Sequence, residues 1–287
     1  MTSTAQGASG ENVAPVDAVD AVVPRTSTSG SGSGPAERYV IGELDLSVEE
    51  VGAELHGTMP AVPELAVPGT PWLRTSALAC LADVVLGLLA VRGIEPRIPV
   101  TLSLDVHLFR EIPVGATVRG VGRAVKSGQT VAVSAIDFLD EDGRLLGVGG
   151  SVFVPAPDPT LRMPGLRWAL DSLRRRYGPL PEPFADRLRC EQTEPGTASM
   201  PLRPEVSNAA GTLNGGLVPV IIEEAVRSLT PGATLSSLGM QYLRPVRRGP
   251  AVARATSHGE VGTVQVHDSA TDALAIVATT RIFPAPR

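Results

Sequence analysis

The chain has 287 residues, and because a domain usually holds ~150 residues this length predicts about two domains. Apolar residues make up 43% of the sequence and charged residues 19%, so a sizeable core can form. The formal net charge is -5 and aromatic residues are only 3%, which argues against the basic surface and the stacking platform that nucleic-acid binding needs. We therefore expect no nucleic-acid partner.

No targeting signal, membrane span or disulfide pattern is visible in the sequence. Its two cysteines, Cys80 and Cys190, lack C-x-x-C spacing. Residues 1–20 have neither the basic nor the apolar region of a secretory signal. The longest apolar stretch, at 77–91, is interrupted by Asp83 and is shorter than a bilayer span. We expect a cytoplasmic protein without a membrane partner.

The first half of the chain contains a tail and one α+β repeat. Residues 1–37 are rich in Ser, Thr, Gly, Ala and Pro, cannot bury enough apolar surface to offset the entropy of ordering, and are predicted to be disordered. Residues 38–157 form the first repeat, with an extended segment at 39–58 and a helix at 75–90. Because this helix is apolar nearly all round, it must be buried on every side. Four strands are expected to follow at 100–110, 116–125, 130–139 and 145–154.

The second half is predicted to have the same order of elements. A linker rich in Pro and Arg, with a short helix, is expected at 158–185, and the second repeat at 186–287. This repeat begins with an extended segment at 187–202 and a helix at 215–228. Its four strands are expected at 235–243, 251–257, 263–269 and 273–283.

An internal duplication connects the two halves. The run Leu-Asp-Val-His-Leu-Phe-Arg at 104–110 aligns with Leu-Gly-Met-Gln-Tyr-Leu-Arg at 238–244, an offset of 134 residues (110 to 244). Gly115 and Gly249 keep the same offset (115 to 249). Self-similarity of this kind indicates a repeated structural unit. The predicted fold class is therefore α+β, built from two copies of one unit.

The start of the second buried helix carries most of the functional information. Residues 208–216 read Asn-Ala-Ala-Gly-Thr-Leu-Asn-Gly-Gly, and an apolar helix with Glu223 follows. Glycine at a helix start allows a ligand to approach the backbone closely, and the free N–H groups there can hold a developing oxyanion. A carboxylate among Ile and Val, such as Glu223, has to pair, line a cavity or acquire a raised pKa.

This segment resembles the hotdog-fold acyl-CoA thioesterases of the PaaI type, and Tyr-Leu-Arg-Pro-Val at 242–246 is similar to a strand motif of that family. The resemblance covers both halves, at 40–155 and 186–284. It implies a double-hotdog chain, in which an antiparallel sheet wraps a central helix in each repeat. It also implies hydrolysis of an acyl-CoA to the free acid and CoA, with no cofactor and no metal.

The resemblance assigns roles to four residues of the second half. Gly215 matches the glycine whose backbone N–H polarises the thioester carbonyl, and Glu223 matches the acid that acts as general base or nucleophile. Asn208 matches an asparagine that orients the substrate or the water. Asn214 stands where the family commonly has His; it keeps a hydrogen-bonding side chain, but it cannot titrate.

The first half departs further from the family pattern. Asp83 keeps the acid, but Arg-Thr-Ser at 74–76 stands where the family has His-Gly-Gly. We therefore expect Glu223 to mark the working site and Asp83 to be vestigial or secondary. Because the family shares its site across a hotdog pair, a hydroxyl from the first half is expected to contribute, with Thr101 or Ser103 as the candidate.

Basic residues are expected to bind the phosphates of CoA. Arg244, Arg247 and Arg248 follow a predicted strand, and Lys126 lies in a basic turn. The alternative interpretation is a solvated charged loop. For assembly, we expect a homo-oligomer, either a dimer or a trimer of double-hotdog chains.

Three further alternatives stay open at this point. Glu223 could face solvent beside Glu224. The protein could be a non-catalytic module that binds acyl-CoA or another small ligand, because the family His is absent at Asn214. A hydratase of the same fold is less favoured, since no His lies near either acid in the sequence.

Overall fold

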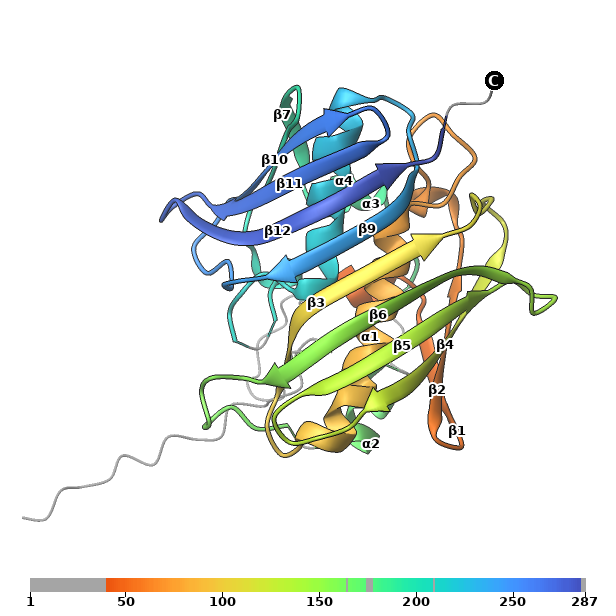
Figure 1. Ribbon diagram of the computed structural model, residues 1–287, viewed down its shortest axis with the longest axis vertical. Coiled ribbons are helices and arrows are strands. Elements are labelled where there is room, and N and C mark those ends of the chain that lie inside the picture. The colour runs from red at the N-terminus through yellow and green to blue at the C-terminus, as the bar shows by residue number, and fades with distance from the viewer. Residues whose placement is uncertain (1–39, 164, 174–177, 209, 285–287) are drawn as a thin grey trace, which may run out of the picture.

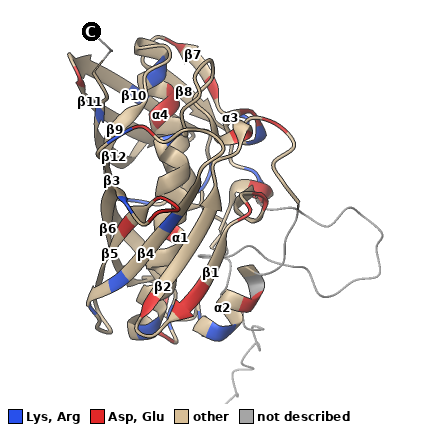
Figure 2. Cartoon of the chain, turned by 90° about the vertical axis from the view of Figure 1, so that its right-hand side faces the viewer, with Lys and Arg blue, Asp and Glu red and all other residues tan. Residues whose placement is uncertain are grey.

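The computed structural model describes residues 40–163, 165–173, 178–208 and 210–284; the predicted tail at 1–37 lies outside these ranges. The fold is α+β. A twelve-stranded antiparallel sheet curls around two buried helices, α1 (Thr75–Ile94) and α4 (Val218–Leu229) (Figure 1). Figure 2 shows the sheet nearly edge-on, with both helices on its inner side.

The two halves repeat the same order of elements, a hairpin, a helix and four strands. The first half consists of η2 (Val40–Glu43), β1 (Ser47–Val51), β2 (Glu54–Pro60), η3 (Pro63–Leu65), α1, β3 (Pro99–Leu108), β4 (Thr117–Lys126), β5 (Ala132–Leu139) and β6 (Leu145–Pro155). Two short helices follow, α2 (Leu166–Leu173) and α3 (Phe184–Arg187). The second half consists of β7 (Glu191–Glu194), β8 (Thr197–Met200), η4 (Pro204–Val206), η5 (Gly215–Leu217), α4, β9 (Leu235–Tyr242), β10 (Ala251–His258), β11 (Val261–Asp268) and β12 (Ala273–Ile282).

The two halves join through the pairing of β3 with β9. The strand order is β1-β2-β4-β5-β6-β3-β9-β12-β11-β10-β8-β7, so the order of the second half mirrors that of the first. At the centre of this pairing Asp105 lies opposite Gly239, which is its equivalent at the offset of 134 residues. Two equivalent residues can face each other only on a pseudo-two-fold axis. The predicted duplication is therefore confirmed.

The two extended segments predicted at 39–58 and 187–202 are in fact β-hairpins, β1–β2 and β7–β8. Gly52 and Gly196 lie in the turns with φ of 62° and 80°. This left-handed conformation costs little without a Cβ, so each glycine allows the chain to reverse.

Helix α1 is buried all round, as its composition predicts, and it is longer than predicted. Its apolar face continues to Ile94 and the helix ends before Pro96, because the residue preceding a proline avoids helical backbone angles. By length and composition this helix could cross a membrane, contrary to the expectation for 77–91, but 89% of its apolar window is buried inside the protein.

Glycines in β2 and β4 let α1 lie close to the sheet. A Cβ on Gly57 would lie 2.5 Å from Cγ2 of Val85 and 2.9 Å from Cδ1 of Leu81. A Cβ on Gly122 would lie 2.6 Å from Cγ1 of Val85. Val85 follows Leu81 by four residues, so both side chains lie on one face of α1 and occupy the space that these glycines leave.

Gly57→Ala is expected to lower the free energy of unfolding by about 1–3 kcal/mol, because the added methyl overpacks a closed contact. Urea denaturation of both proteins measures the difference. Gly239→Ala is the matched control: its Cβ would meet only Oγ1 of Thr279, at 3.5 Å, so a change within about 0.5 kcal/mol is expected. Equal losses in both variants would show that close packing is not what requires glycine at position 57.

Candidate functional site

The start of the second buried helix presents a free backbone donor. Asn214 caps this turn, with its Oδ1 accepting a hydrogen bond from the Gly216 N–H at 2.9 Å. The hydroxyl of Tyr242 donates to the carbonyl oxygen of Gly215 at 2.8 Å. Within the described part of the chain no acceptor is found for the Gly215 N–H. The first N–H groups of a helix lack internal partners, so this one is available to a ligand.

The acid that faces this turn is Asp83, from the helix of the other half. A Cβ on Gly216 would lie 3.0 Å from its Oδ2, and a Cβ on Gly215 would lie 3.9 Å from its Oδ1. Thr101 donates its hydroxyl hydrogen bond to Asp83 Oδ1 at 3.0 Å. Asp83 and Thr101 of the first half thus meet Asn214, Gly215 and Gly216 of the second, and we call these five residues the mixed site.

The environment of Asp83 tunes its ionisation. Burial raises the pKa of the Asp83 carboxyl to about 6, and hydrogen bonds from Thr101 and the Gly216 N–H oppose that rise. Desolvation disfavours the charged form, while donors to the carboxylate favour it. A carboxylate that ionises near pH 6 is a stronger base than an ordinary aspartate and is still charged at neutral pH. These are the properties of a general base.

A β-bulge places Thr101 in the mixed site. The pairing of β3 with β6 shifts between Thr101 and Ser103, so Leu102 leaves the ladder and is exposed. A bulge of this kind redirects the neighbouring side chains. Of the two predicted hydroxyl candidates, Thr101 is therefore the one that reaches Asp83. Ser103 pairs within the sheet, and its carbonyl accepts a hydrogen bond from the Ser151 hydroxyl at 2.6 Å.

Glu223 does not lie beside Gly215, so the predicted pairing of these two residues is wrong. They are eight residues apart along one helical segment, a rise of ~12 Å. Glu223 instead meets the start of the other helix. It accepts hydrogen bonds from the Thr75 N–H at 3.0 Å, the Ser76 hydroxyl at 2.6 Å and the Arg74 Nε at 3.0 Å.

Glu223 belongs to a closed cluster of charges. Arg74 also pairs with Glu224, which accepts from Arg227 Nη1 and Gln192 Nε2, both at 2.7 Å. Although burial opposes its charge, Glu223 and Glu224 hold the pKa of Arg74 above its ordinary value. Arg74 is 1% exposed and Glu223 0%, which also excludes the solvent-facing alternative for Glu223. We call the four charged residues, Arg74, Glu223, Glu224 and Arg227, the buried charge cluster.

The pseudo-two-fold axis relates these two clusters, and substitutions make them different. Arg74 stands where the second half has Asn214, and Thr75 stands where it has Gly215. The Thr75 N–H is taken by Glu223, and its hydroxyl donates to the Leu235 carbonyl at 2.6 Å. Leu235 occupies the place of Thr101. The second cluster therefore lacks both a free oxyanion donor and a strand hydroxyl.

Asn208 shapes the loop before the mixed site. Its side-chain oxygen accepts hydrogen bonds from the Ala210 N–H and from the N–H and hydroxyl of Thr212, at 3.0–3.1 Å. Among the described residues, the hydrogen bonds of Asn208 stay within its own loop, so its role toward substrate or water stays a prediction.

Three predicted phosphate-binding residues lie in one loop, which starts beside the mixed site and is held at Arg247 and Arg248 by Asp268, and the fourth lies elsewhere. Arg244, Arg247 and Arg248 are exposed, in the loop that follows Tyr242. The Leu213 N–H donates to the carbonyl of residue 246 at 3.0 Å, which fixes this loop beside Asn214. Lys126 lies at the end of β4, on the same side of the sheet's ends as this loop. Because β4 is four strands from β9, Lys126 lies ~19 Å from β9.

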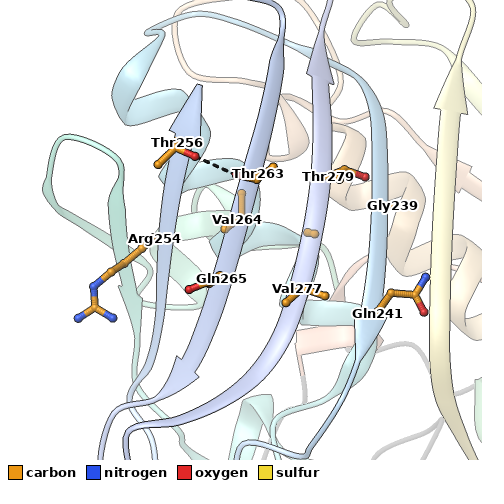
Figure 3. A pocket seen from close by; sticks show the side chains of 10 residues that line it. Gly239, Gln241, Arg254, Thr256, Thr263, Val264, Gln265, Val277 and Thr279 are labelled. Carbon is orange, nitrogen blue, oxygen red and sulfur yellow. Dashed lines mark hydrogen bonds between the residues drawn. The ribbon is translucent and has the colours of Figure 1, made fainter. Parts of the chain in front are cut away.

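The outer face of the sheet carries a separate hollow of about 510 Å³ (Figure 3). Its lining comes from outward-facing residues of β9 to β12, among them Gln241, Arg254, Gln265 and Thr279. The hollow contains none of the predicted site residues and lies on the face opposite the helices. It is therefore not part of the mixed site.

One Asp-His-Ser arrangement also lies on the outer face. His107 Nδ1 is 2.8 Å from the Ser237 hydroxyl, and His107 Nε2 is 3.5 Å from Asp105. The side chains of His107 and Asp105 are exposed, Ser237 is half-buried, and the backbone around them is paired within the sheet. Without free N–H donors for an oxyanion, this row is not a hydrolytic centre. Across the described ranges, no group of three His, Cys, Asp or Glu residues could hold a metal ion.

Comparisons with known proteins agree with this architecture. The family model described as "Acyl-CoA thioesterase C-terminal domain" matches residues 16–149. An acyl-ACP thioesterase from Bacteroides thetaiotaomicron is 14% identical, with a TM-score of 0.57 over 80% of this chain and 98% of that one. The 12:0-ACP thioesterase from Umbellularia californica is 17% identical, with a TM-score of 0.55 over 82% of this chain and 99% of that one.

The PaaI protein of E. coli matches only one half. It is 14% identical and covers 39% of this chain and 80% of its own, with a TM-score of 0.36. A search of curated proteins finds no match. The whole chain therefore has the double-hotdog fold of these two solved thioesterases, and the family match covers residues 16–149.

Removing the charge of Asp83 is expected to stabilise the fold, whereas removing the charge of Glu223 is expected to destabilise it. Asp83 has a folded pKa of about 6, above its unfolded value, so stability falls as pH rises from about 4 to about 6 and the loss is complete above that range. Asp83→Asn is therefore expected to raise the free energy of unfolding by about 1–3 kcal/mol at pH 7, and the gain is expected to vanish at pH 4.

Glu223→Gln is the matched comparison. It leaves the buried charge cluster with one uncompensated cation, so a loss of about 3 kcal/mol is expected. Urea denaturation at pH 4 and pH 7 measures both variants. A loss of stability in Asp83→Asn at pH 7 would contradict the assignment of an unfavourable buried charge to Asp83.

Proposed function

We propose that the protein is an acyl-CoA thioesterase, which hydrolyses an acyl-CoA to the free acid and CoA at the mixed site. The observation that carries the proposal is the free Gly215 N–H next to a buried carboxylate, Asp83, whose pKa is raised to about 6. Thioester hydrolysis needs a donor for the developing oxyanion and a base for water, and these two groups supply them.

The proposed reaction uses Gly215, Thr101 and Asp83 of the mixed site. The thioester carbonyl oxygen accepts from the Gly215 N–H, and Thr101 keeps the Asp83 carboxylate oriented. Asp83 removes a proton from water while the oxygen of that water bonds to the acyl carbon. The C–S bond then breaks, and the proton passes from Asp83 to the departing sulfur of CoA. Direct attack by the Asp83 carboxylate on the acyl carbon is the alternative route.

The buried charge cluster does not support the same chemistry. The oxygens of Glu223 accept three hydrogen bonds, from Arg74, Thr75 and Ser76, and its side chain is closed to solvent. A base in that position has no access to water or thioester. We therefore assign the catalytic acid to Asp83 and a structural role to Glu223, which reverses the expectation drawn from sequence.

Asp83→Asn is expected to lower kcat/KM for acyl-CoA by at least ~100-fold, because the variant keeps the shape of the side chain and loses the base. A thiol reagent that reports free CoA, used with a panel of acyl chain lengths, measures the rate. Glu223→Gln, assayed where it is still folded, is the control and is expected to keep a rate near that of the parent. Loss of activity only in Glu223→Gln would overturn the assignment.

The pH dependence follows from the same group. Asp83 has to be ionised to accept a proton, so kcat/KM is expected to rise with pH, with its midpoint at about 6, and to level off above pH 7. A profile from pH 4.5 to 8.5 measures the midpoint. A rate that is flat across this range would exclude Asp83 as the base.

The arginine loop is proposed to bind the phosphates of CoA, because its three exposed guanidinium groups follow Tyr242 at the edge of the mixed site. The double variant Arg244→Ala and Arg247→Ala is expected to raise KM for acyl-CoA by about 3- to 10-fold without changing kcat. The KM for an acyl-pantetheine, which lacks the nucleotide, is expected to stay the same. Arg144→Ala, at an exposed arginine in the distant β5–β6 turn, is the control. An equal rise for both substrates would contradict phosphate binding.

A non-catalytic acyl-CoA binding protein is the second candidate, and the presence of Asn214 where the family commonly has His favours it. Asn214 caps the turn but cannot move a proton. Calorimetry with acyl-CoA separates the two functions, since tight binding without release of free CoA would support the binding protein.

A further inference from the structure

We propose that Tyr242 is a positioning residue for the mixed site. Its hydroxyl holds the peptide unit between Gly215 and Gly216 in one orientation, and we call this contact the tyrosine clamp. In that orientation the Gly216 N–H can donate to the Asp83 carboxylate, and the Gly215 N–H stays free for the thioester. This inference rests on the proposed function of the mixed site. It adds a residue for which the sequence suggested only membership of a strand motif.

Tyr242 contacts the glycine turn from the end of strand β9. It is the last residue of β9, and its hydroxyl lies 2.8 Å from the Gly215 carbonyl oxygen. A Cβ on Gly215 would lie 3.8 Å from Cε1 of the ring, so the ring packs beside this glycine. Two successive glycines have wide conformational freedom, and an outside contact is needed to hold one orientation of their peptide.

The clamped peptide connects Tyr242 to Asp83. The Gly215 carbonyl and the Gly216 N–H belong to one peptide unit, and a hydrogen bond at the carbonyl strengthens the N–H as a donor. The Gly216 N–H donates to Asn214 Oδ1, and its hydrogen bond to the Asp83 carboxylate lowers the pKa of Asp83. Burial, followed by the charge of Asp83, raises the pKa of the Tyr242 hydroxyl, so it remains a protonated donor at neutral pH.

The other half of the chain has no such clamp. Its equivalent of Tyr242, at the offset of 134 residues, is Leu108. There the helix start carries Thr75 instead of glycine, and the Thr75 hydroxyl bonds to a strand carbonyl. Tyr242 therefore occurs beside the helix start that has glycines and faces Asp83. Its equivalent Leu108 occurs in the half whose helix start belongs to the buried charge cluster. A role confined to packing would not need a hydroxyl in one half only.

Tyr242→Phe removes the hydroxyl and keeps the ring. It is expected to lower kcat by about 10-fold with KM for acyl-CoA changed by less than about 2-fold, since one hydrogen bond is lost and no substrate contact is removed. The midpoint of the pH profile is expected to move upward, because a weaker Gly216 donor stabilises the Asp83 anion less. Met240→Leu, which alters the other neighbour of the hydroxyl, is the control and is expected to leave kcat and the midpoint unchanged.

A measurement without turnover separates this inference from the proposed function. The carboxyl ¹³C signal of Asp83, followed through a pH titration, is expected to give a higher midpoint in Tyr242→Phe than in the parent. If the parent hydrolyses no thioester but this shift occurs, the proposed function fails and the clamp stands. If the parent is active and Tyr242→Phe leaves kcat, the pH midpoint and the Asp83 titration unchanged, the clamp is wrong.

If Tyr242→Phe folds poorly, a second variant, Tyr242→Leu, tests the same inference. Tyr242→Leu copies Leu108, around which the other half of the chain folds, and it is expected to shift the Asp83 titration in the same direction. An unshifted titration in a folded Tyr242→Leu protein would overturn the inference.

Discussion

The antiparallel pairing of β3 with β9 is the contact on which the rest of the structure depends. Asp105 and Gly239 are equivalent residues of the two repeats and lie opposite each other, so this pairing creates the pseudo-two-fold axis. The axis sets α1 and α4 side by side on one face of the sheet. In that arrangement the start of each helix meets the acid of the other, and both acid clusters draw residues from both halves.

The two symmetry-related clusters show how a duplicated unit can assign different tasks to its copies. In the buried charge cluster every oxygen of Glu223 is satisfied, and two arginines balance two glutamates in a closed space. In the mixed site Asp83 has fewer donors and a raised pKa, and a backbone N–H nearby is free. Satisfying buried charges favours stability, whereas an under-satisfied acid is costly for the fold and useful for chemistry.

Much of the architecture could be predicted from residue patterns. The apolar run around Asp83 predicted a buried helix, and the repeat of the 104–110 motif at 238–244 predicted two copies of one unit. The hairpins at Gly52 and Gly196 were missed, because a single turn glycine inside an alternating segment is a weak signal beside the apolar pattern. The match of Thr101 to a hydroxyl shared between halves was the one clue that the site crosses the repeats.

The sequence by itself determined the two buried helices, the four strands after each of them, the duplication and the kinds of groups available, because helix and strand periodicity are properties of neighbouring residues. Only the tertiary structure decided which acid faces the glycine turn. Gly215 and Glu223 are close in the sequence but two helical turns apart, and Asp83 is distant in the sequence but reaches Gly215 across the pseudo-two-fold axis. Whether a carboxylate is sealed by an arginine or left reactive depends on that long-range meeting, which no local pattern records.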